Sequence, residues 1–396
     1  MDKLIIYHFH NGSGGGVLSV IKNLIRFSNN SNIENNIIYT INKTEIPNYN
    51  IENIEGATTQ QIFYYTSNNN FYYTCNQLAK LLPNNKVLIV AHDWIELGMI
   101  SNLGLQNPVV QVLHGDFDYY YELAISNQYF IDAFICISPT IYKKLISKIG
   151  DRKSCISYLN FPVPYLEKKS LKNDNFNIVF NVRNLTDYRK QFPIIIEIAK
   201  ELELDKNKYF FTVIGEGYTQ ETFFEIWPSA MKDRVNYLGS IPNKIILDLL
   251  PSQDIILLPS LFEGFPVSLI EAMKAGVVPL ITNWDGAVDE LIESGVSGYY
   301  LNIGDVNGYV TIIKKLQNDK FLKEIISANC VIKADQYFNP FKNTKKFEDV
   351  FKAIFINVNV VKKSKKHYGS RLDQIWIPNK FVLLFRNIIK YMSCLH

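Results

Sequence analysis

Cysteine is scarce in this 396-residue sequence, and its five cysteines never form a Cys-x-x-Cys pair. An odd number of widely spaced cysteines argues against a disulfide framework, and the missing pairs argue against a structural zinc site. No other cluster of metal ligands is apparent, so the sequence predicts neither a metal ion nor a bound cofactor. This use of cysteine is typical of a reducing compartment.

Long hydrophobic runs are also missing. The apolar segment at residues 4–7 is too short for a signal peptide. No stretch approaches the roughly 18 apolar residues of a membrane span. With 47% hydrophobic and 20% charged residues, the composition is that of a globular protein. We expect a cytoplasmic protein without a nucleic-acid partner.

What the sequence does contain is an alternation of strand and helix patterns. Apolar runs alternate with segments whose apolar residues recur every three or four positions. Strands are predicted at residues 3–9, 37–41, 87–91, 109–113, 133–137, 177–182, 209–214, 235–238, 255–258 and 278–282. Helices are predicted at residues 17–25, 72–82, 139–149, 192–202, 244–250 and 267–275. This order favours an α/β fold with parallel sheets covered on both faces.

The alternation breaks around residues 160–175, which are first extended and proline-rich and then polar. We interpret this segment as an interdomain linker. It separates two predicted doubly wound, Rossmann-like domains, residues 1–165 and 176–340. Such sheets bind ligands at the C-terminal ends of their strands, so we expect a site in a central cleft between the domains. A helix at residues 341–361 and a basic tail at 362–396 follow.

Two glutamates flank the start of a predicted helix. Glu263 lies in the loop after the strand at 255–258, and Glu271 lies on the second turn of the helix that begins near Pro266. Both should lie near the C-terminal edge of the sheet. Carboxylates accept hydrogen bonds from sugar hydroxyls, so the two acids could hold two sugars of one donor. The alternative is that both are solvated surface residues.

The two acids belong to the motif Glu-Gly-Phe-Pro-x4-Glu-Ala-Met-x-Ala-Gly at residues 263–276. This motif resembles the signature of retaining GT-B glycosyltransferases, in particular glycosyltransferase family 4. Residues 279–282, 290–292 and 295–301 resemble its continuation, and the similarity covers roughly residues 3–345. It implies two Rossmann-like domains that face a cleft, with the donor bound mainly by the C-terminal domain.

The resemblance also implies roles for residues on the donor side. Glu263 matches the acid that binds the transferred sugar, and Glu271 matches the acid that binds ribose. Arg183 and Lys190 match the two cations that hold the diphosphate and neutralise the leaving group. The remaining donor-binding positions are Gly15, Gly16, Gly264 and Phe265.

This sequence departs from the family pattern near the two cations. Asn181, Val182 and Gln191 stand where glycines are common. The match is therefore one of residue order, and Arg189 could take the role of Lys190.

The N-terminal half supplies the acceptor side of the expected site. His114 follows the strand at 109–113 and matches a His-Gly near the reacting carbon, which implies a catalytic role. The acceptor-side residues implied by the resemblance are His92, Asp93 and Asp116. A lone histidine is more often structural, and this alternative stays open.

The function implied is that of a retaining hexosyltransferase that works without a metal ion. It would move a sugar from a nucleotide-diphosphate sugar to a glycan or lipid-linked acceptor in bacterial surface polysaccharide biosynthesis. Specificity is expected in the loops at 42–53 and 117–121. The alternatives are an epimerase or phosphorylase of the same fold and a non-catalytic scaffold. The glycine turn at 12–16, with Glu34 further on, raises an NAD-binding alternative. The turn does not spell out Gly-x-Gly-x-x-Gly, and this alternative does not explain the second half of the chain.

The tail is strongly basic, and the rest of the chain has a net negative charge. Residues 362–396 hold eight Lys or Arg and one acid, whereas the formal charge of the whole chain is +3. Apolar residues from 381 to 389 keep helical spacing beside Lys380, Arg386 and Lys390, and Trp376 precedes them. One hypothesis is that residues 362–390 bind an anionic membrane surface at the inner face of the plasma membrane. The other is that this helix packs on the N-terminal domain, to which the resemblance implies that the helix at 341–361 crosses back.

Overall fold

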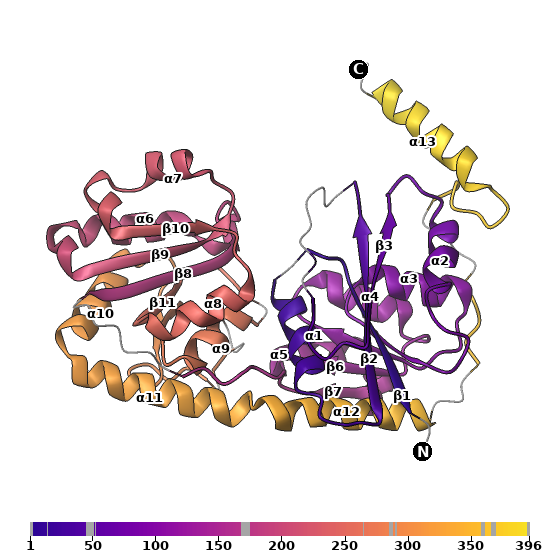
Figure 1. Cartoon of the computed structure of the whole chain (residues 1–396), viewed down its shortest axis with the longest axis horizontal. Coiled ribbons are helices and arrows are strands. Elements are labelled where there is room, and N and C mark those ends of the chain that lie inside the picture. The colour runs from indigo at the N-terminus through magenta and orange to yellow at the C-terminus, as the bar shows by residue number, and fades with distance from the viewer. Residues whose placement is uncertain are drawn as a thin grey trace. The chain divides into compact units, whose positions relative to one another are not determined.

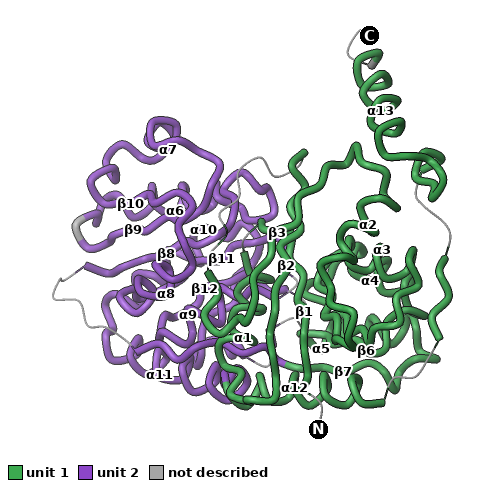
Figure 2. Tube along the Cα trace, turned by 45° about the vertical axis from the view of Figure 1, so that its right-hand side comes forward, with its two compact units in different colours: residues 1–159, 341–396 green, residues 160–340 purple. Residues whose placement is uncertain are grey.

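The computed structural model describes residues 3–13, 15–44, 51, 53–167, 175–263, 265–284, 288–289, 291–357, 361–365 and 370–393. The chain divides into two compact units, drawn in green and purple in Figure 2. Unit 1 contains residues 1–159 and 341–396, and unit 2 contains residues 160–340. The last segment of the chain therefore belongs to the same unit as the first.

Unit 1 is built on a parallel sheet of seven strands in the order β3-β2-β1-β4-β5-β6-β7. The strands are β1 (Leu4–His10), β2 (Ile33–Asn42), β3 (Thr59–Tyr65), β4 (Leu88–Ala91), β5 (Val109–Leu113), β6 (Ala133–Cys136) and β7 (Ile156–Tyr158). Strand β1 lies between β2 and β4, so that Tyr7 is opposite both Asn36 and Ile89. Strands β4, β5 and β6 are buried along their whole length, which explains their largely apolar sequences.

The helices of unit 1 form two groups (Figure 1). One group contains α2 (Phe71–Ala79), α3 (Trp94–Leu103), α4 (Asp118–Asn127) and α5 (Pro139–Lys148), and each contacts the next. The other contains α1 (Gly16–Arg26) and α12 (Pro340–Asn357). The ring of Phe27, at the end of α1, packs on that of Phe341 in α12, with 5.3 Å between the ring centroids. The short helix η1 (Gly150–Cys155) precedes β7, and α13 (Asn379–Ser393) ends the described chain.

Unit 2 repeats the same plan with a parallel sheet in the order β10-β9-β8-β11-β12-β13. The strands are β8 (Phe176–Asn184), β9 (Tyr209–Glu216), β10 (Val235–Gly239), β11 (Ile255–Leu258), β12 (Val278–Thr282) and β13 (Tyr299–Leu301). The helices are η2 (Tyr188–Lys190), α6 (Phe192–Glu201), η3 (Glu203–Lys208), α7 (Gln220–Ile226), η4 (Ser229–Arg234), α8 (Asn243–Leu249), η5 (Leu250–Ser252), α9 (Val267–Lys274), α10 (Val306–Asn318) and α11 (Lys320–Tyr337).

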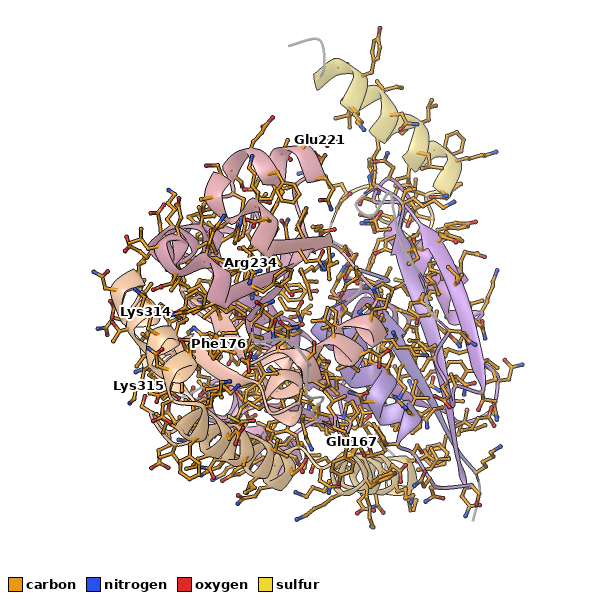
Figure 3. The ribbon with its side chains drawn as sticks, turned by 60° about the vertical axis from the view of Figure 1, so that its left-hand side comes forward. Glu167, Phe176, Glu221, Arg234, Lys314 and Lys315 are labelled. Atoms are coloured by element: carbon orange, nitrogen blue, oxygen red, sulfur yellow. The ribbon has the colours of Figure 1, made fainter. Side chains whose placement is uncertain are left out.

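Side chains tie the N-terminal ends of the strands in unit 2 together. Arg234, labelled with Phe176 in Figure 3, donates to the carbonyl of Tyr209 at 3.1 Å and to Oδ1 of Asn175 at 2.6 Å. The ring of Phe176 lies 6.3 Å from that of Tyr209. These contacts hold the N-terminal ends of the strands together. Ligands in this class of fold bind at the other, C-terminal ends.

Each predicted strand is present, but three short or edge strands and several helices were missed. Strand β3 is an edge strand with a partly exposed, alternating face, and β7 and β13 have only three residues each. The prediction of a loop at residues 117–121 is wrong, because α4 begins at Asp118. Of the loop predicted at 42–53, residues 45–50 and 52 lie outside the described residues.

The segment interpreted as a linker is in part a piece of the core of unit 2. Phe161 and Val163 are fully buried. The ring of Phe161 packs on those of Phe265 and Phe338, with centroid distances of 5.7 and 5.1 Å. The proline-rich sequence was a sign of extended backbone, and only its apolar residues indicated burial. Residues 168–174 lie outside the described part of the chain.

The expectation that the lysine run at 362–366 faces a membrane is wrong for Lys362. Its side chain is 1% exposed, and its ammonium donates to Asp132 at 2.6 Å and to the carbonyl of Asn107 at 2.7 Å. Ser364 donates to the carbonyl of Asn102 at 2.6 Å. Residues 362–365 are thus fastened to unit 1, whereas Lys366 lies outside the described residues.

We predict that Phe161→Ala lowers the free energy of unfolding by about 3–5 kcal/mol, because it empties a ring-sized space in the core of unit 2. Urea titration followed by circular dichroism measures the change. Leu204→Ala is the matched control, since Leu204 is 98% exposed and its loss should cost less than about 0.5 kcal/mol. Equal effects of the two substitutions would contradict the assignment of Phe161 to the core.

Candidate active site

An ion pair joins the loops that follow β8 and β11 in unit 2. The ammonium of Lys190 donates to Oε1 of Glu263 at 2.6 Å, and the hydroxyl of Ser260 donates to the same oxygen at 2.7 Å. The side chains of Lys190 and Glu263 are 23% and 10% exposed. Strands β8 and β11 are the neighbours at which the strand order reverses, the usual place for a ligand in a doubly wound sheet.

The loop that carries Lys190 is fixed by its own contacts. The guanidinium of Arg189 forms an ion pair with Asp187, with 2.6 Å from Nη2 to Oδ2. The carbonyl of Arg189 accepts the N–H of Leu261 at 2.8 Å, which links this loop to the one after β11. Arg189 therefore shapes the loop, and Lys190 is the cation that reaches Glu263.

Gln191 explains why a glycine suits the position after Lys190. It has a φ of 55°, and it is the one non-glycine residue in the described part of the chain with a positive φ. A side chain in this left-handed conformation costs roughly 1–2 kcal/mol. The amide of Gln191 donates to the carbonyl of Tyr188 at 2.7 Å, which offsets part of the cost.

Glu271 lies buried in the second turn of α9, 3% exposed. The side-chain amide of Asn243 donates to its Oε1 at 3.1 Å. Burial raises the pKa of Glu271 to about 7, although the hydrogen bond from Asn243 acts in the opposite direction. A ligand that donates hydroxyl groups to this carboxylate would favour its ionised form.

The other predicted donor residues of unit 2 have different environments. Arg183, near the end of β8, has its Nε 3.9 Å from Glu216, and its side chain is 58% exposed. The side chain of Phe265 is a core residue that packs on Phe161 and Phe338. Gly264 lies outside the described residues.

In unit 1, three histidines form a hydrogen-bonded chain across the ends of β1, β4 and β5. Nδ1 of His8 is 3.1 Å from Nε2 of His92, and Nδ1 of His92 is 2.8 Å from Nε2 of His114. All three rings are buried. His92 and His114 follow β4 and β5 directly, so the parallel register places them side by side.

The histidines are neutral at neutral pH. Burial lowers the pKa of His8 to about 4 and that of His114 to about 3. Burial, and then the neighbouring imidazoles, hold the pKa of His92 well below its ordinary value. An imidazole that is neutral carries one N–H, so both hydrogen bonds of the chain must run in the same direction.

The direction of these bonds sets the chemistry of His114. When the donors point toward His114, its Nδ1 carries a proton and can donate. When they point toward His8, Nδ1 of His114 is an acceptor. This nitrogen is buried and has no hydrogen-bond partner among the described residues. It therefore has unused capacity for one hydrogen bond, as donor or as acceptor.

Asp93 lies beside the histidine chain and caps α3. Its carboxylate accepts the N–H of Trp94 at 3.0 Å, the amide of Asn11 at 2.9 Å, and the hydroxyl of Tyr119. Beneath it, Glu96 accepts the backbone N–H groups of His92 and Asp93 at 2.7 and 2.6 Å. Burial, and then the charge of Asp93, raise the pKa of Glu96 to about 7.

Asp116 has a structural role that the sequence did not indicate. One of its oxygens accepts the hydroxyl of Tyr121 at 2.7 Å, and the other accepts the ammonium of Lys144 at 2.6 Å. Both oxygens are thereby used in joining α4 to α5.

The glycine turn after β1 leaves the start of α1 open. Gly15 has a φ of 89°, and α1 begins at Gly16 with no side-chain cap and no acid in its first turn. The free N–H groups and the helix dipole favour an anion at this point. Glu34 lies near the start of β2 and pairs with Lys3 at 3.0 Å. A ribose-binding acid would lie at the other end of that strand, so the position of Glu34 also argues against the NAD alternative.

Sequence reasoning missed three polar partners of the site: Ser260, Asn243 and His8. Ser260 lies two residues after the buried strand β11, and that position was a usable signal. Asn243 and His8 become neighbours of Glu271 and His92 only through the fold, and nothing in their local sequence marks them.

Sequence comparisons match part of the chain. Residues 164–333 match the family described as Glycosyl transferases group 1. The UDP-Gal:alpha-D-GlcNAc-diphosphoundecaprenol alpha-1,3-galactosyltransferase of Escherichia coli is 28% identical over 152 residues, 37% of this chain and 38% of that protein. The amylovoran biosynthesis glycosyltransferase AmsK of Erwinia amylovora is 32% identical over 145 residues, 35% of each chain. The matched region spans little more than a third of these relatives.

A structural comparison covers nearly the whole chain. The pneumococcal O-GlcNAc transferase GtfA, solved in complex with UDP and GlcNAc, is similar with a TM-score of 0.70 and 12% identity. The match covers 90% of this chain and 100% of that chain. The two parallel-sheet, Rossmann-like units are thus those of the GT-B fold, and the predicted fold class is confirmed.

The histidine chain predicts a loss of stability in acid that one substitution should reduce. The unfolded chain binds protons near the ordinary histidine pKa of about 6.5, whereas folded His8 binds them only near pH 4. The free energy of unfolding therefore falls as the pH drops from about 6.5 toward 4. His8→Gln removes one such group, so its stability should fall less between about pH 7 and pH 5 than that of the wild type.

Urea unfolding at the two pH values measures this difference. The raised pKa values of Glu96 and Glu271 act in the opposite direction, but they are common to both proteins and cancel in the comparison. Ile6→Val is the control, because it trims a buried residue of the same strand and should cost about 1 kcal/mol at both pH values. Parallel pH profiles of wild type and His8→Gln would rule out this account.

Proposed function

We propose that the chain is a retaining glycosyltransferase. It transfers a sugar from a nucleotide-diphosphate sugar to a glycan or lipid-linked acceptor in bacterial surface polysaccharide biosynthesis. The observation that carries the proposal is the Lys190–Glu263–Ser260 contact where the strand order of unit 2 reverses. Buried Glu271, on the helix that follows the same loop, adds a second acid suited to hydroxyl groups.

The donor is proposed to bind unit 2 along this edge. Glu271 accepts the ribose hydroxyls, and Glu263 accepts hydroxyls of the transferred sugar. Lys190 and Arg183 hold the diphosphate, with the N–H groups near Gly15 and Gly16 as further phosphate donors. The names of the E. coli relative and of the GtfA complex both include UDP, so uridine is the first base to test.

The proposed reaction places its largest charge change on the diphosphate. The bond from the sugar C1 to the diphosphate oxygen breaks, and the acceptor oxygen bonds to C1 on the same face. The proton of the acceptor passes to the departing diphosphate. Lys190 and Arg183 would stabilise the negative charge that grows on the leaving group without a metal ion.

Unit 1 is proposed to supply the acceptor side. Nδ1 of His114 is a buried polar atom with spare hydrogen-bonding capacity, which suits a hydroxyl group near the reacting carbon. Because His92 sets which ring nitrogen of His114 carries a proton, it acts through His114. Asp93 orients the loop beside it.

We predict that Glu263→Gln and Lys190→Ala each reduce turnover about a hundredfold or more, because they remove groups that act on the reacting sugar and the leaving group. Release of UDP from UDP-sugars, with a polyprenyl-diphosphate-linked sugar as acceptor, measures the rate. Lys200→Ala is the control, since the Lys200–Glu197 pair is exposed on α6.

Activity should survive EDTA. Loss of activity with the chelator and its recovery with Mg²⁺ or Mn²⁺ would contradict the metal-independent scheme.

Donor binding without sugar transfer to any acceptor would favour the alternative of a non-catalytic scaffold.

We predict that Glu271→Gln weakens UDP-glucose binding by about 1–3 kcal/mol at pH 8, because a charged acceptor is lost. With a pKa of about 7, Glu271 is mostly protonated at pH 6, so wild-type affinity should rise about tenfold from pH 6 to pH 8. Calorimetry measures both, and the diphosphate of UDP-glucose does not titrate in this range. The same pH dependence in Glu271→Gln would show that another group is responsible.

A further inference from the structure

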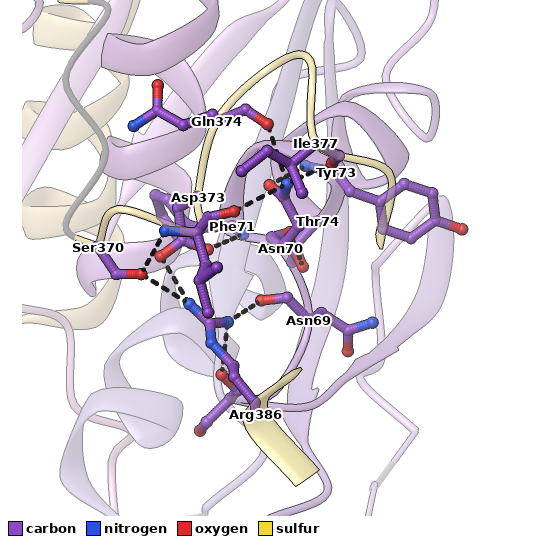
Figure 4. A network of polar contacts seen from close by, with 12 residues as sticks. Asn69, Asn70, Phe71, Tyr73, Thr74, Ser370, Asp373, Gln374, Ile377 and Arg386 are labelled. Atoms are coloured by element: carbon purple, nitrogen blue, oxygen red, sulfur yellow. Dashed lines mark hydrogen bonds and ion pairs between the residues drawn. The ribbon is translucent and has the colours of Figure 1, made fainter. Parts of the chain in front are cut away.

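The C-terminal segment of unit 1 is held by a polar network at the start of α2 (Figure 4). The amide of Asn70 donates to the carbonyls of Gln374 and Ile377 at 3.0 and 2.9 Å. The N–H of Phe71 donates to Asp373 at 2.7 Å. Residues 370–379 are thereby fastened to the loop between β3 and α2.

Arg386 extends this network into α13. Its guanidinium donates to the carbonyl of Asn69 at 2.6 Å, to the carboxylate of Asp373 at 2.8 Å and to the hydroxyl of Ser370 at 3.2 Å. Val382, one turn earlier, is fully buried. These two residues define the inner face of the helix.

The outer face of α13 is apolar and exposed. Its large apolar residues recur every three or four positions, so they lie on one side of the helix. Their exposed fractions are 47% for Phe381, 56% for Leu384, 52% for Phe385, 46% for Ile388, 61% for Ile389 and 61% for Met392. An exposed apolar surface of this extent marks an interaction site.

The charge around this face identifies the partner. Helix α13 contains Lys380, Arg386 and Lys390 and no acid. The acid that precedes it, Asp373, is neutralised by Arg386. Trp376 and Tyr391, at the two ends of the segment, are 77% and 71% exposed. Apolar side chains flanked by lysines and by aromatic rings are suited to the boundary between lipid headgroups and acyl chains.

The length of the helix indicates how it would meet a bilayer. Among the described residues, none of the helices combines the length and the apolar composition that crossing a membrane requires. We propose that α13 lies in the surface of an anionic lipid bilayer, with its outer face inserted and with Val382 and Arg386 on the protein. The proposal does not depend on the catalytic function.

Binding to vesicles tests this proposal on the whole 396-residue chain. The wild type should cosediment with phosphatidylglycerol-containing vesicles, less at high salt and less with phosphatidylcholine alone. Leu384→Glu combined with Ile388→Glu should weaken binding more than about tenfold, because both charges enter the apolar face. Shortening the chain before Lys362 is a poorer test, since it leaves Asp132 buried without its partner.

The matched control is Leu204→Glu combined with Ile332→Glu, which makes the same changes at exposed apolar positions of unit 2. This control should bind vesicles as the wild type does. Lys380→Gln should reduce binding to anionic vesicles and leave the weak binding to phosphatidylcholine unchanged.

Equal binding by the Leu384/Ile388 variant and the wild type would overturn the proposal. The proposal would also be overturned if the wild type did not bind vesicles and formed a dimer, while the Leu384/Ile388 variant stayed monomeric. A second copy of the chain would then cover the outer face of α13. Light scattering distinguishes the dimer from the monomer.

Discussion

The ion pair between Lys190 and Glu263 joins two loops that the chain brings from different strands, and the candidate site of unit 2 depends on it. Its position is fixed from both sides. The carbonyl of Arg189 accepts a hydrogen bond from the N–H of Leu261. The carbonyl of Ser260 accepts hydrogen bonds from the hydroxyl of Thr282 and the indole N–H of Trp284, at and just after the end of β12. A cation held at 2.6 Å from a carboxylate is partly neutralised, and a diphosphate would have to compete for it. The pair therefore holds the ammonium of Lys190 in place, and an anion that binds Lys190 has to displace the carboxylate of Glu263 from it.

The ion pair of unit 2 and the histidine chain of unit 1 differ in how far they are exposed to solvent. At the strand ends of unit 2, Lys190, Glu263 and Arg183 keep some access to solvent. At the equivalent edge of unit 1, burial removes the charge, and the histidines are linked as neutral rings. In either direction the bonds within the chain are satisfied, whereas the terminal N–H, at Nε2 of His8 or Nδ1 of His114, is buried without a partner among the described residues, which costs free energy. The histidine chain also couples His114 to His8 on the first strand, since reversing one hydrogen bond requires reversing the other.

Much of this arrangement could be predicted from the sequence, for one physical reason. Strands buried on both faces must be apolar runs, and the loop that follows each run must start at the same edge of a parallel sheet. This places Glu263, His92 and His114 correctly without any knowledge of the packing. It cannot place Asn243 or His8, because their roles arise from neighbours distant in sequence. It also misjudged Phe161 and Lys362, whose local sequences are typical of a linker and of a solvated basic run.

Lys362 and Arg386 illustrate why charge in a sequence says little about exposure. Each pairs with an acid that is itself nearly buried, Asp132 and Asp373. Buried pairs of this kind add little net stability, but breaking one leaves an uncompensated charge, so they favour a single arrangement of the chain. Among the described residues after α12, the ion pairs of Lys362 and Arg386 fasten the chain to unit 1, and Val382 is buried beside Arg386. Charged and amide side chains fasten α13 to unit 1, so most of its large apolar residues are not used in this attachment and are exposed on the outer face of the helix.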